Sequence, residues 1–362
     1  MKPTAVLRTH PTDFEVEEIP AYVPVGEGTH MFLRVRKTGL TTFDCVRLLA
    51  KRYGVDPRDV GYAGMKDRHA VTVQWISLPW PMAREDDPGD PGIPGVELLE
   101  AKRHGNKLRT GHLEGNRFRI VLRNIRPLDA VAEVERGLRE LASKGVPNAF
   151  GPQRFGRDGS NPERALGWLR GEHRGPGAPR EKRLLISSLQ SLLFDDVLER
   201  RVADGTWDTV LAGDLVRRAD SGGLFLSEDP SADAPRARSG EISATGPMFG
   251  ARMRWPEGRP EQIEREVLAS RLGDASVLER FGKLGEGARR ALRVVPGELT
   301  VEAIEGEADA IAVRFVLPKG SYATTLIGQV CEAQDASRPG YGKETETSTE
   351  SDPLQDAQLG SE

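Results

Sequence analysis

Apolar and charged residues alternate through the first third of the chain. Residues 13–19 read DFEVEEI, and residues 31–37 read MFLRVRK. A period of two is typical of a β-strand that buries one face and exposes the other. Segments at 71–78, 96–101 and 117–123 also have strand character. The sequence therefore predicts a half-buried sheet in this part of the chain.

Three segments have the periodicity of amphipathic helices: 42–53, 129–144 and 183–203. Gly54 and Gly145 are expected to end the first two helices, and Asp129 is expected to cap the second. Residues 204–260 are rich in Gly, Asp and Ser and predict small strands and loops. Helices and strands thus share the chain, which indicates the α/β (α+β) fold class.

The end of the chain contains one more strand and one more helix. Residues 310–318 read as a strand, and residues 321–331 read as a helix. These elements need partners, and the first α/β region can supply them. A chain of 362 residues is also expected to form two domains, because single hydrophobic cores stop growing near ~250–300 residues.

Several classes of protein are excluded. The longest run without a charged side chain, residues 69–83, is 15 residues long and too short to span a membrane. Arg8, His10 and Asp13 interrupt the N-terminus before an apolar signal region can form. Two cysteines, and six histidines without metal-ligand spacing, predict neither a disulfide framework nor a metal site. We therefore expect a protein of the reducing cytoplasm.

Charge is unevenly distributed along the chain. The formal net charge of −4 argues against a nucleic-acid partner. Residues 335–362 alone contain seven acidic and two basic residues, a net charge of −5, which leaves +1 for residues 1–334. The segment 334–362 is rich in Ser, Thr and Glu and poor in aliphatic residues, so we expect a disordered acidic tail outside the fold.

Residues 101–157 have the opposite bias. They contain thirteen Lys and Arg against five acidic residues, a net charge of +8. Such an excess suits contact with a phosphate backbone, because each neutralised phosphate releases condensed counterions. An ordinary solvated face rich in arginine has the same composition. Charge alone therefore does not distinguish RNA binding from a soluble surface.

The most unusual local sequence is GYAGMKDRHAVTVQ, at 61–74, directly before a predicted strand. Asp67 lies between Lys66 and Arg68, whose positive charges favour its carboxylate form. An ionised carboxylate in this position can act as a nucleophile or a base. The alternative is a loop aspartate that accepts hydrogen bonds from backbone amides beside two solvated cations.

Other candidates combine aromatic rings with a side-chain amide. Asn116 precedes a strand that carries Phe118, and Tyr322 lies at a helix start preceded by Gly320. Aromatic stacking together with amide hydrogen bonding is how proteins hold a flipped-out base. With Phe14, these residues could form a base-reading pocket. Each of them alone is also explained as a turn or core residue.

Five motifs follow one another along the chain: DFEVEE at 13–18, GMKDRHAVT at 64–72, GNRF at 115–118, VPNAFGPQRFG at 146–156 and GSYAT at 320–324. With these motifs in this order, residues 7–331 resemble the TruD family of tRNA pseudouridine synthases. The resemblance implies an enzyme, an isomerase, that converts uridine 13 of tRNA to pseudouridine without a cofactor or a metal. tRNA is then the partner, and we expect a cytoplasmic monomer without membrane contact.

The resemblance also implies a domain organisation. A mixed-sheet catalytic domain would be formed by residues 1–144 and 295–333. An inserted α+β TRUD domain at 145–294 would interrupt it, and the acidic tail at 334–362 has no counterpart in the family pattern.

By position, the resemblance implies the following site residues: Asp67 as catalytic nucleophile, Phe14, Asn116 and Tyr322 in substrate binding, and Arg8 and Phe118 in support. Arg8 matches the basic partner of the aspartate, which is often Lys in relatives; Arg keeps the charge and changes the geometry. Tyr322 stands where relatives may carry Phe, so its hydroxyl needs a partner or water.

Two other functions are compatible with the residues. A non-catalytic RNA-binding protein on the same scaffold would have lost the carboxylate, whereas Asp67 is present. A hydrolase would use Asp67 and His69 as an acid–base pair. Two residues apart in an extended segment, however, these side chains would face opposite sides.

Overall fold

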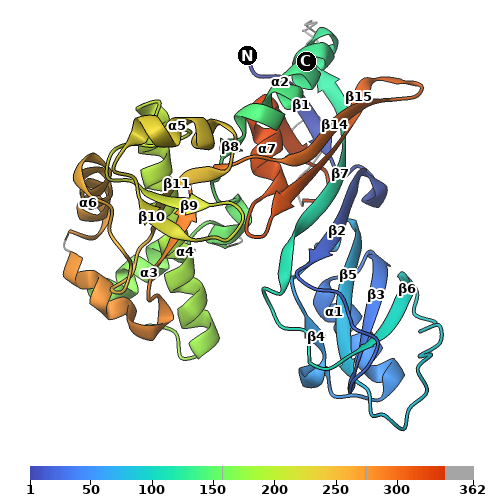
Figure 1. Cartoon of the computed structure of the whole chain (residues 1–362). Coiled ribbons are helices and arrows are strands. Elements are labelled where there is room, and N and C mark those ends of the chain that lie inside the picture. The colour runs from blue at the N-terminus through green and yellow to red at the C-terminus, as the bar shows by residue number, and fades with distance from the viewer. Residues whose placement is uncertain (157, 274, 339–362) are drawn as a thin grey trace, which may run out of the picture.

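The structure, a computed structural model, describes residues 1–338 except 157 and 274. Two lobes are visible in Figure 1. The sheet lobe contains a ten-stranded sheet with helices α1, α2 and α7, and the helical lobe contains helices α3 to α6 and a four-stranded sheet. Most of the predicted acidic tail, from residue 339 onward, lies outside the described residues.

The large sheet is built from both ends of the chain. Its main path has the order β14-β15-β7-β2-β5-β3-β6; β1 joins β7 and β16, and β4 joins β5. Its strands are β1 (Thr4–Leu7), β2 (Phe14–Pro20), β3 (His30–Thr38), β4 (Gly61–Tyr62), β5 (Val71–Pro79), β6 (Val96–His104), β7 (Leu113–Arg126), β14 (Gly297–Ile304), β15 (Glu307–Pro318) and β16 (Glu332–Asp335). The pairs β1–β16 and β2–β5 are parallel, whereas β2–β7 and β7–β15 are antiparallel. The predicted α/β class with a mixed sheet is confirmed.

Three helices cover parts of this sheet: α1 (Thr42–Tyr53), α2 (Val131–Lys144) and α7 (Ala323–Val330). Helix α1 begins with a capping box between Thr41 and Asp44 and ends at Gly54, whose φ of 67° lies in the left-handed region that favours glycine. Helix α2 follows a short 3-10 turn that contains Asp129, and its N-cap, Ala130, has no side-chain hydrogen bond. The prediction that Asp129 caps this helix is therefore wrong.

The helical lobe contains α3 (Asn161–Arg170), α4 (Pro179–Ala203), α5 (Pro230–Arg238), α6 (Gly258–Leu272), β9 (Leu215–Arg218), β10 (Leu224–Leu226), β11 (Ile242–Met248) and β12 (Ala288–Ala291). Helix α4 begins four residues earlier than predicted, because Pro179 suits the first turn, where an N–H is not needed. Helix α5 lies in a segment for which only strands and loops were expected. Asp229 caps it by accepting hydrogen bonds from the amides of Ser231 and Ala232.

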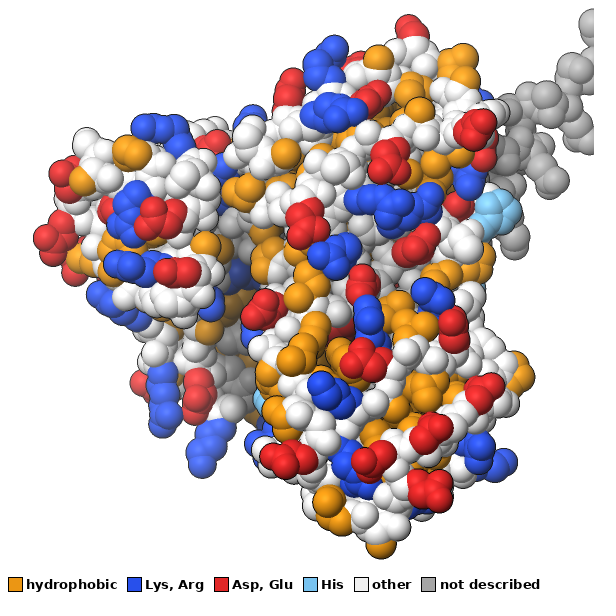
Figure 2. All heavy atoms as spheres, turned by 45° about the vertical axis from the view of Figure 1, so that its right-hand side comes forward, with side chains coloured by type: hydrophobic (Ala, Val, Ile, Leu, Met, Phe, Trp, Pro, Cys, Tyr) orange, Lys and Arg blue, Asp and Glu red, His pale blue; other side chains and the backbone are white. Residues whose placement is uncertain are grey.

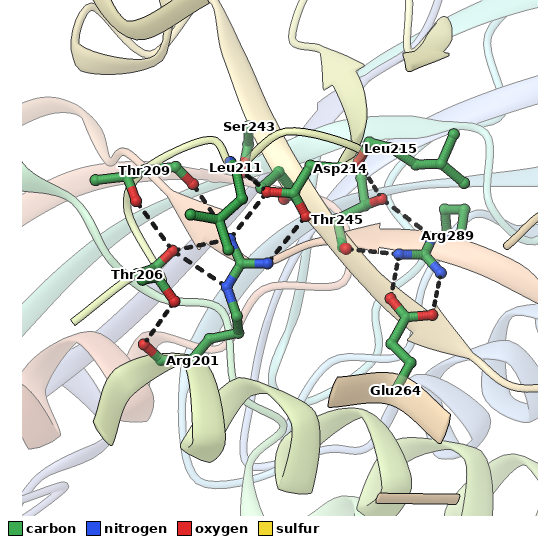
Figure 3. A network of polar contacts seen from close by, with 11 residues as sticks. Arg201, Thr206, Thr209, Leu211, Asp214, Leu215, Ser243, Thr245, Glu264 and Arg289 are labelled. Carbon is green, nitrogen blue, oxygen red and sulfur yellow. Dashed lines mark hydrogen bonds and ion pairs between the residues drawn. The ribbon is translucent and has the colours of Figure 1, made fainter. Parts of the chain in front are cut away.

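Two buried ion pairs connect helices of this lobe to β12 and to the residue that precedes β9 (Figure 3). Arg201 of α4 contacts Asp214 at 2.9 Å, and Arg289 of β12 contacts Glu264 of α6 at 2.7 Å. Removing one member of such a pair leaves a buried charge without its partner, at a cost of about 3–5 kcal/mol. These pairs stabilise the lobe and do not line the cavity described below.

The connection between the lobes is a two-stranded ribbon. The chain leaves the sheet lobe through β8 (Val146–Pro147) and returns through β13 (Arg293–Val294), and these strands pair antiparallel. The buried Arg293 side chain donates to the carbonyls of Ser143, Lys144 and Ala237. This residue therefore fastens the end of α2 to the helical lobe.

One face of the sheet carries ion pairs between side chains of neighbouring strands. Arg119 pairs with Glu15 at 3.1 Å, and Arg117 pairs with Glu17 at 3.5 Å and with Glu298 at 3.2 Å. Figure 2 shows acidic and basic side chains intermingled over the side of the molecule that it brings forward.

The basic stretch predicted at 101–157 is thus partly neutralised in three dimensions. Five of its thirteen bases pair with acids from outside the stretch: Arg103, Arg117, Arg119, Arg123 and Arg126. The net charge of +8, counted along the chain, therefore overstates the positive charge that this region presents to a partner.

Candidate active site

A cavity of about 1030 Å³ is lined by residues of both lobes. The sheet lobe contributes β1, β2, β7, α7, β16 and the loop at 65–67, and the segment 149–153 contributes the opposite wall. A typical small-molecule site measures about 300–1,000 Å³. The cavity therefore has room for a nucleotide together with part of its strand.

All six residues singled out from the sequence line this cavity: Arg8, Phe14, Asp67, Asn116, Phe118 and Tyr322. Strand alternation explains part of this grouping, because Asn116 and Phe118 are two residues apart on β7 and share a face. Phe118 is buried between Phe14 and Phe315, with ring centroids at 6.3 and 5.3 Å, and so supports the Phe14 ring from behind. His69, by contrast, is exposed, and it is not among the described residues that line the cavity.

Asp67 and Arg8 form an ion pair at this wall. Nη2 of Arg8 donates to Oδ2 of Asp67 at 2.8 Å; the Arg8 side chain is 4% exposed and the Asp67 side chain 48%. The guanidinium also lies 3.9 Å from the centre of the Phe14 ring. Arg8 itself has a φ of 56°, a left-handed conformation that costs a non-glycine residue about 1–2 kcal/mol. Such strain often clusters at functional sites, although Asn124 and Glu298 also have positive φ and do not line the cavity.

A second carboxylate, that of Asp335, contacts the same guanidinium. Nη1 of Arg8 donates to its Oδ2 at 2.6 Å, and the amide and hydroxyl of Ser337 donate to its Oδ1. Burial acts to raise the pKa of Asp335, but the Ser337 hydrogen bonds and the Arg8 charge outweigh it, so the pKa is lowered. Asp335 belongs to β16, so the prediction that the disordered tail begins at 334 is wrong. Pairing with β1 extends the fold beyond that point.

Buried polar contacts hold the backbone on which Asp67 lies. Nζ of Lys37, in β3, donates to the carbonyl of Asp67 at 3.0 Å and to that of Leu40 at 2.7 Å. The hydroxyl of Thr42 accepts from the amide of Lys66 at 2.8 Å. Burial lowers the pKa of Lys37 to about 8. The loop that presents Asp67 is therefore tied to both β3 and α1.

Lys66 points into the sheet lobe, although its neighbour Asp67 is half exposed. Its Nζ lies 3.2 Å from Oε2 of Glu18 and donates to Oδ1 of Asn116 at 2.7 Å. Burial raises the pKa of Glu18, and the charge and hydrogen bond of Lys66 counteract this shift. A largely buried cation thus contacts the Asn116 amide at the wall of the cavity.

The opposite wall comes from the segment after β8. The rings of Phe150 and Tyr322 lie 6.0 Å apart, edge to face, and the guanidinium of Arg290 lies 4.1 Å from the Phe150 ring. The amide of Phe150 donates to Asp195 of α4 at 3.0 Å, and burial raises the pKa of Asp195 to about 7. A Cβ atom at Gly151 would lie only 3.0 Å from Cδ1 of Tyr322, so glycine permits this close approach.

Several residues of the site were missed at the level of sequence. Phe150 and Gln153 line the cavity and belong to the motif VPNAFGPQRFG, so that motif was a usable signal. Lys66 stood beside Asp67 and was interpreted only as a neighbouring charge. For Lys37 and Asp335 the sequence offers no signal, because their contacts depend on strand pairing far along the chain.

The arrangement suits nucleophilic chemistry on a large polar substrate. It combines a solvent-accessible carboxylate, a fixed cation beside it, aromatic rings and a side-chain amide. Within the described part of the chain, no group of three or more His, Cys, Asp or Glu side chains could hold a metal ion. Likewise, none of the described helices has the length and apolar character needed to cross a membrane.

Known proteins are similar to this chain in sequence and in fold. The family model for tRNA pseudouridine synthase D (TruD) matches residues 3–163 and 178–330. The tRNA pseudouridine synthase D of Anaeromyxobacter sp. (strain Fw109-5) is 43% identical over 333 residues, which cover 90% of this chain and 92% of the relative. A tRNA pseudouridine synthase D of Thermus thermophilus is 47% identical over 331 residues, covering 91% and 89%. A TruD crystal structure from Methanosarcina mazei has the same fold, with a TM-score of 0.70 at 23% identity over 91% of this chain and 94% of that one.

Proposed function

Because the chain belongs to the TruD family of tRNA pseudouridine synthases, we propose that it isomerises uridine 13 of tRNA to pseudouridine, with Asp67 as nucleophile. The observation that carries this proposal is the Asp67 carboxylate, which is paired with Arg8 at 2.8 Å and lines the cavity together with Phe14, Asn116 and Tyr322.

The reaction breaks the N1–C1′ bond of uridine and joins C5 of the same base to C1′. The base must first leave the RNA stack, which costs a few kcal/mol that stacking and phosphate contacts offset. Asp67 then attacks C1′, or stabilises the oxocarbenium-like centre there, while the electrons of the N1–C1′ bond leave with the uracil. After the uracil rotates, C5 bonds to C1′ and releases the carboxylate; C5 loses its proton and N1 gains one. Substrate and product contain the same atoms, so no redox partner is required.

The other cavity residues have roles that fit this sequence of steps. Arg8 pairs with the Asp67 carboxylate and keeps it in place, and Asp335 keeps Arg8 in place. Phe14 and Tyr322 enclose the base with apolar surface, while Asn116 supplies a polar contact to its edge. Contacts with these walls would retain the detached uracil until it rejoins the ribose.

The same proposal covers the domain organisation. Residues 1–144 and the segment from 295 to the end of β16 at Asp335 would form the catalytic domain, and residues 145–294 the inserted domain. The adjacency of β8 and β13 supports this division, because an inserted domain needs its entry and exit side by side. We place the enzyme in the cytoplasm as a monomer that acts on tRNA and uses no cofactor.

Mapping pseudouridine in tRNA tests this proposal. The full-length protein is incubated with an unmodified tRNA transcript, and pseudouridine is located by carbodiimide-dependent stops in reverse transcription. We expect one new stop, at position 13, and none with Asp67→Asn. A stop at another position would contradict the site preference. Binding of the tRNA without any stop would instead indicate a non-catalytic RNA-binding protein, and a change in nucleoside mass would indicate a hydrolase.

A further inference from the structure

We propose that Lys66, anchored by Glu18, holds the Asn116 amide in one orientation, so that the cavity presents a hydrogen-bond donor that selects uracil over cytosine. This inference rests on the proposed function, since it assumes that the target base enters this cavity. Lys66 and Glu18 are then positioning residues, and Asn116 is the residue that contacts the base.

Strand pairing brings Glu18 and Asn116 together, and Lys66 reaches both from the loop before β5. Glu18 of β2 and Asn116 of β7 are directly opposite in the antiparallel register. Nζ of Lys66 reaches both of them, at 3.2 Å from Oε2 of Glu18 and 2.7 Å from Oδ1 of Asn116. The Lys66 side chain is 5% exposed, and that of Glu18 is fully buried.

The chemistry of lysine decides which way the amide faces. An ammonium group has three donors and no acceptor, so the Asn116 atom that it contacts must be the oxygen. The Nδ2 branch is left for the cavity that Asn116 lines, and among the described residues Nδ2 has no hydrogen-bond partner. A reversed amide would place two donors against each other and leave a buried ammonium hydrogen unpaired. An unpaired buried group of this kind disfavours the reversed amide by roughly 5- to 150-fold.

A fixed donor distinguishes the two pyrimidines. Uracil has carbonyl acceptors at C2 and C4, whereas cytosine has an amine, a donor, at C4. The isomerisation also requires that the base can form the same hydrogen bond after it has rotated. Rotation about the N3–C6 axis that brings C5 to the former place of N1 also exchanges the C2 and C4 carbonyls. The Nδ2 donor therefore meets a carbonyl both before and after the uracil rotates, while cytosine would present its amine at one of these stages.

Binding measurements in an inactive background test this inference. We would measure the dissociation constants of Asp67→Asn for two tRNA transcripts, with uridine or cytidine at the target position. The inference places C4 of the unreacted base at Nδ2, where cytosine carries its amine, so we expect uridine to bind about 10-fold more tightly. Adding Lys66→Met frees the amide to turn, so the preference falls to within about 3-fold. The matched control is Lys51→Met, which removes an exposed lysine from α1 and leaves the preference unchanged.

A second variant keeps the test decisive if Lys66→Met does not fold. Asn116→Asp retains an oxygen for Lys66 and turns an acceptor toward the cavity, so we expect the preference to reverse in favour of cytidine. An unchanged uridine preference in folded Lys66→Met, or in Asn116→Asp, overturns the inference. The proposed function fails separately, if the unaltered protein makes no pseudouridine in tRNA.

Discussion

Replacing Arg8 by Met removes the guanidinium that Asp67 and Asp335 share. The pair with Asp335 is mostly buried, with side chains 4% and 12% exposed, so its loss costs about 1.5–3 kcal/mol. The pair with Asp67 is half exposed and contributes roughly 0.2–1 kcal/mol, and the contact with the Phe14 ring contributes roughly 0.5–2 kcal/mol. These contributions are not fully additive, and together they predict a loss of about 2–4 kcal/mol.

This loss is measurable as a change in melting temperature. At roughly 2.1 cal/mol/K of unfolding entropy per residue, the described part of the chain unfolds with about 0.7 kcal/mol/K, so Tm falls by about 3–6 °C. The assay is thermal unfolding at pH 7, followed by circular dichroism. Arg47→Met is the matched control, because the Arg47 side chain is 75% exposed and its ion pair with Asp44, at 3.7 Å, is too long for a hydrogen bond. Its Tm is expected to stay within about 1 °C of the unaltered protein.

Activity and pH provide two further readouts of the same variant. Without Arg8, Asp67 loses its fixed position, and kcat/KM is expected to fall by about 10- to 100-fold. The lowered pKa of Asp335 means that its stabilising effect is present above its unfolded pKa and is lost as pH falls through its folded pKa. The stability gap between the two proteins therefore narrows in acid. An unchanged Tm at pH 7, or a gap that does not respond to acid, would refute the shared role of Arg8.

Three other variants test the surroundings of the site. Because burial lowers the pKa of Lys37 to about 8, the unfolded chain binds more protons than the folded chain between pH 8 and 10.5, and stability rises as pH rises through that window. The stability of the unaltered protein relative to Lys37→Met is therefore expected to increase over the same range. A constant stability difference would be inconsistent with this pKa. Burial raises the pKa of Asp195 to about 7, so between about pH 4 and 7 the folded chain binds more protons than the unfolded chain. As pH rises through this range, the protein is expected to lose stability relative to Asp195→Asn. Parallel stability curves for the two proteins in urea denaturation would argue against this pKa. Gly151→Ala places a methyl 3.0 Å from Tyr322, and we expect KM to rise by roughly 3- to 10-fold at an unchanged Tm; an unchanged KM would show that Tyr322 does not contact substrate.

Local patterns predicted local structure well. The alternation at 13–19 and 31–37 appears as β2 and β3, and the apolar face at 42–53 appears as α1, because each pattern reports which side of an element is buried. Asp129 shows the limit of this reasoning: a capping residue type is common in any turn, and here it falls in the 3-10 turn before α2.

Contacts between distant segments could not be predicted in this way. Asp335 reaches Arg8 only because β16 pairs with β1, across more than 300 residues, and its Ser- and Glu-rich surroundings suggest a tail. The charge of residues 101–157 was overstated for the same reason, since Glu15, Glu298 and other partners come from strands elsewhere in the chain. The family resemblance identified the six cavity residues, whereas the contacts of Lys37, and those of Glu18 within the motif at 13–18, became visible only in the fold.

The central claim is that the Asp67 carboxylate is the nucleophile that converts uridine to pseudouridine. Its most direct test is the single-turnover rate of isomerisation by Asp67→Asn, measured with enzyme in excess over radiolabelled tRNA, together with the dissociation constant. We predict that the rate falls by at least about 10⁴-fold, because the nucleophile is lost, while the dissociation constant changes by less than about 3-fold, because the shape and the Arg8 contact are kept. A rate within about 10-fold of the unaltered enzyme would contradict the claim.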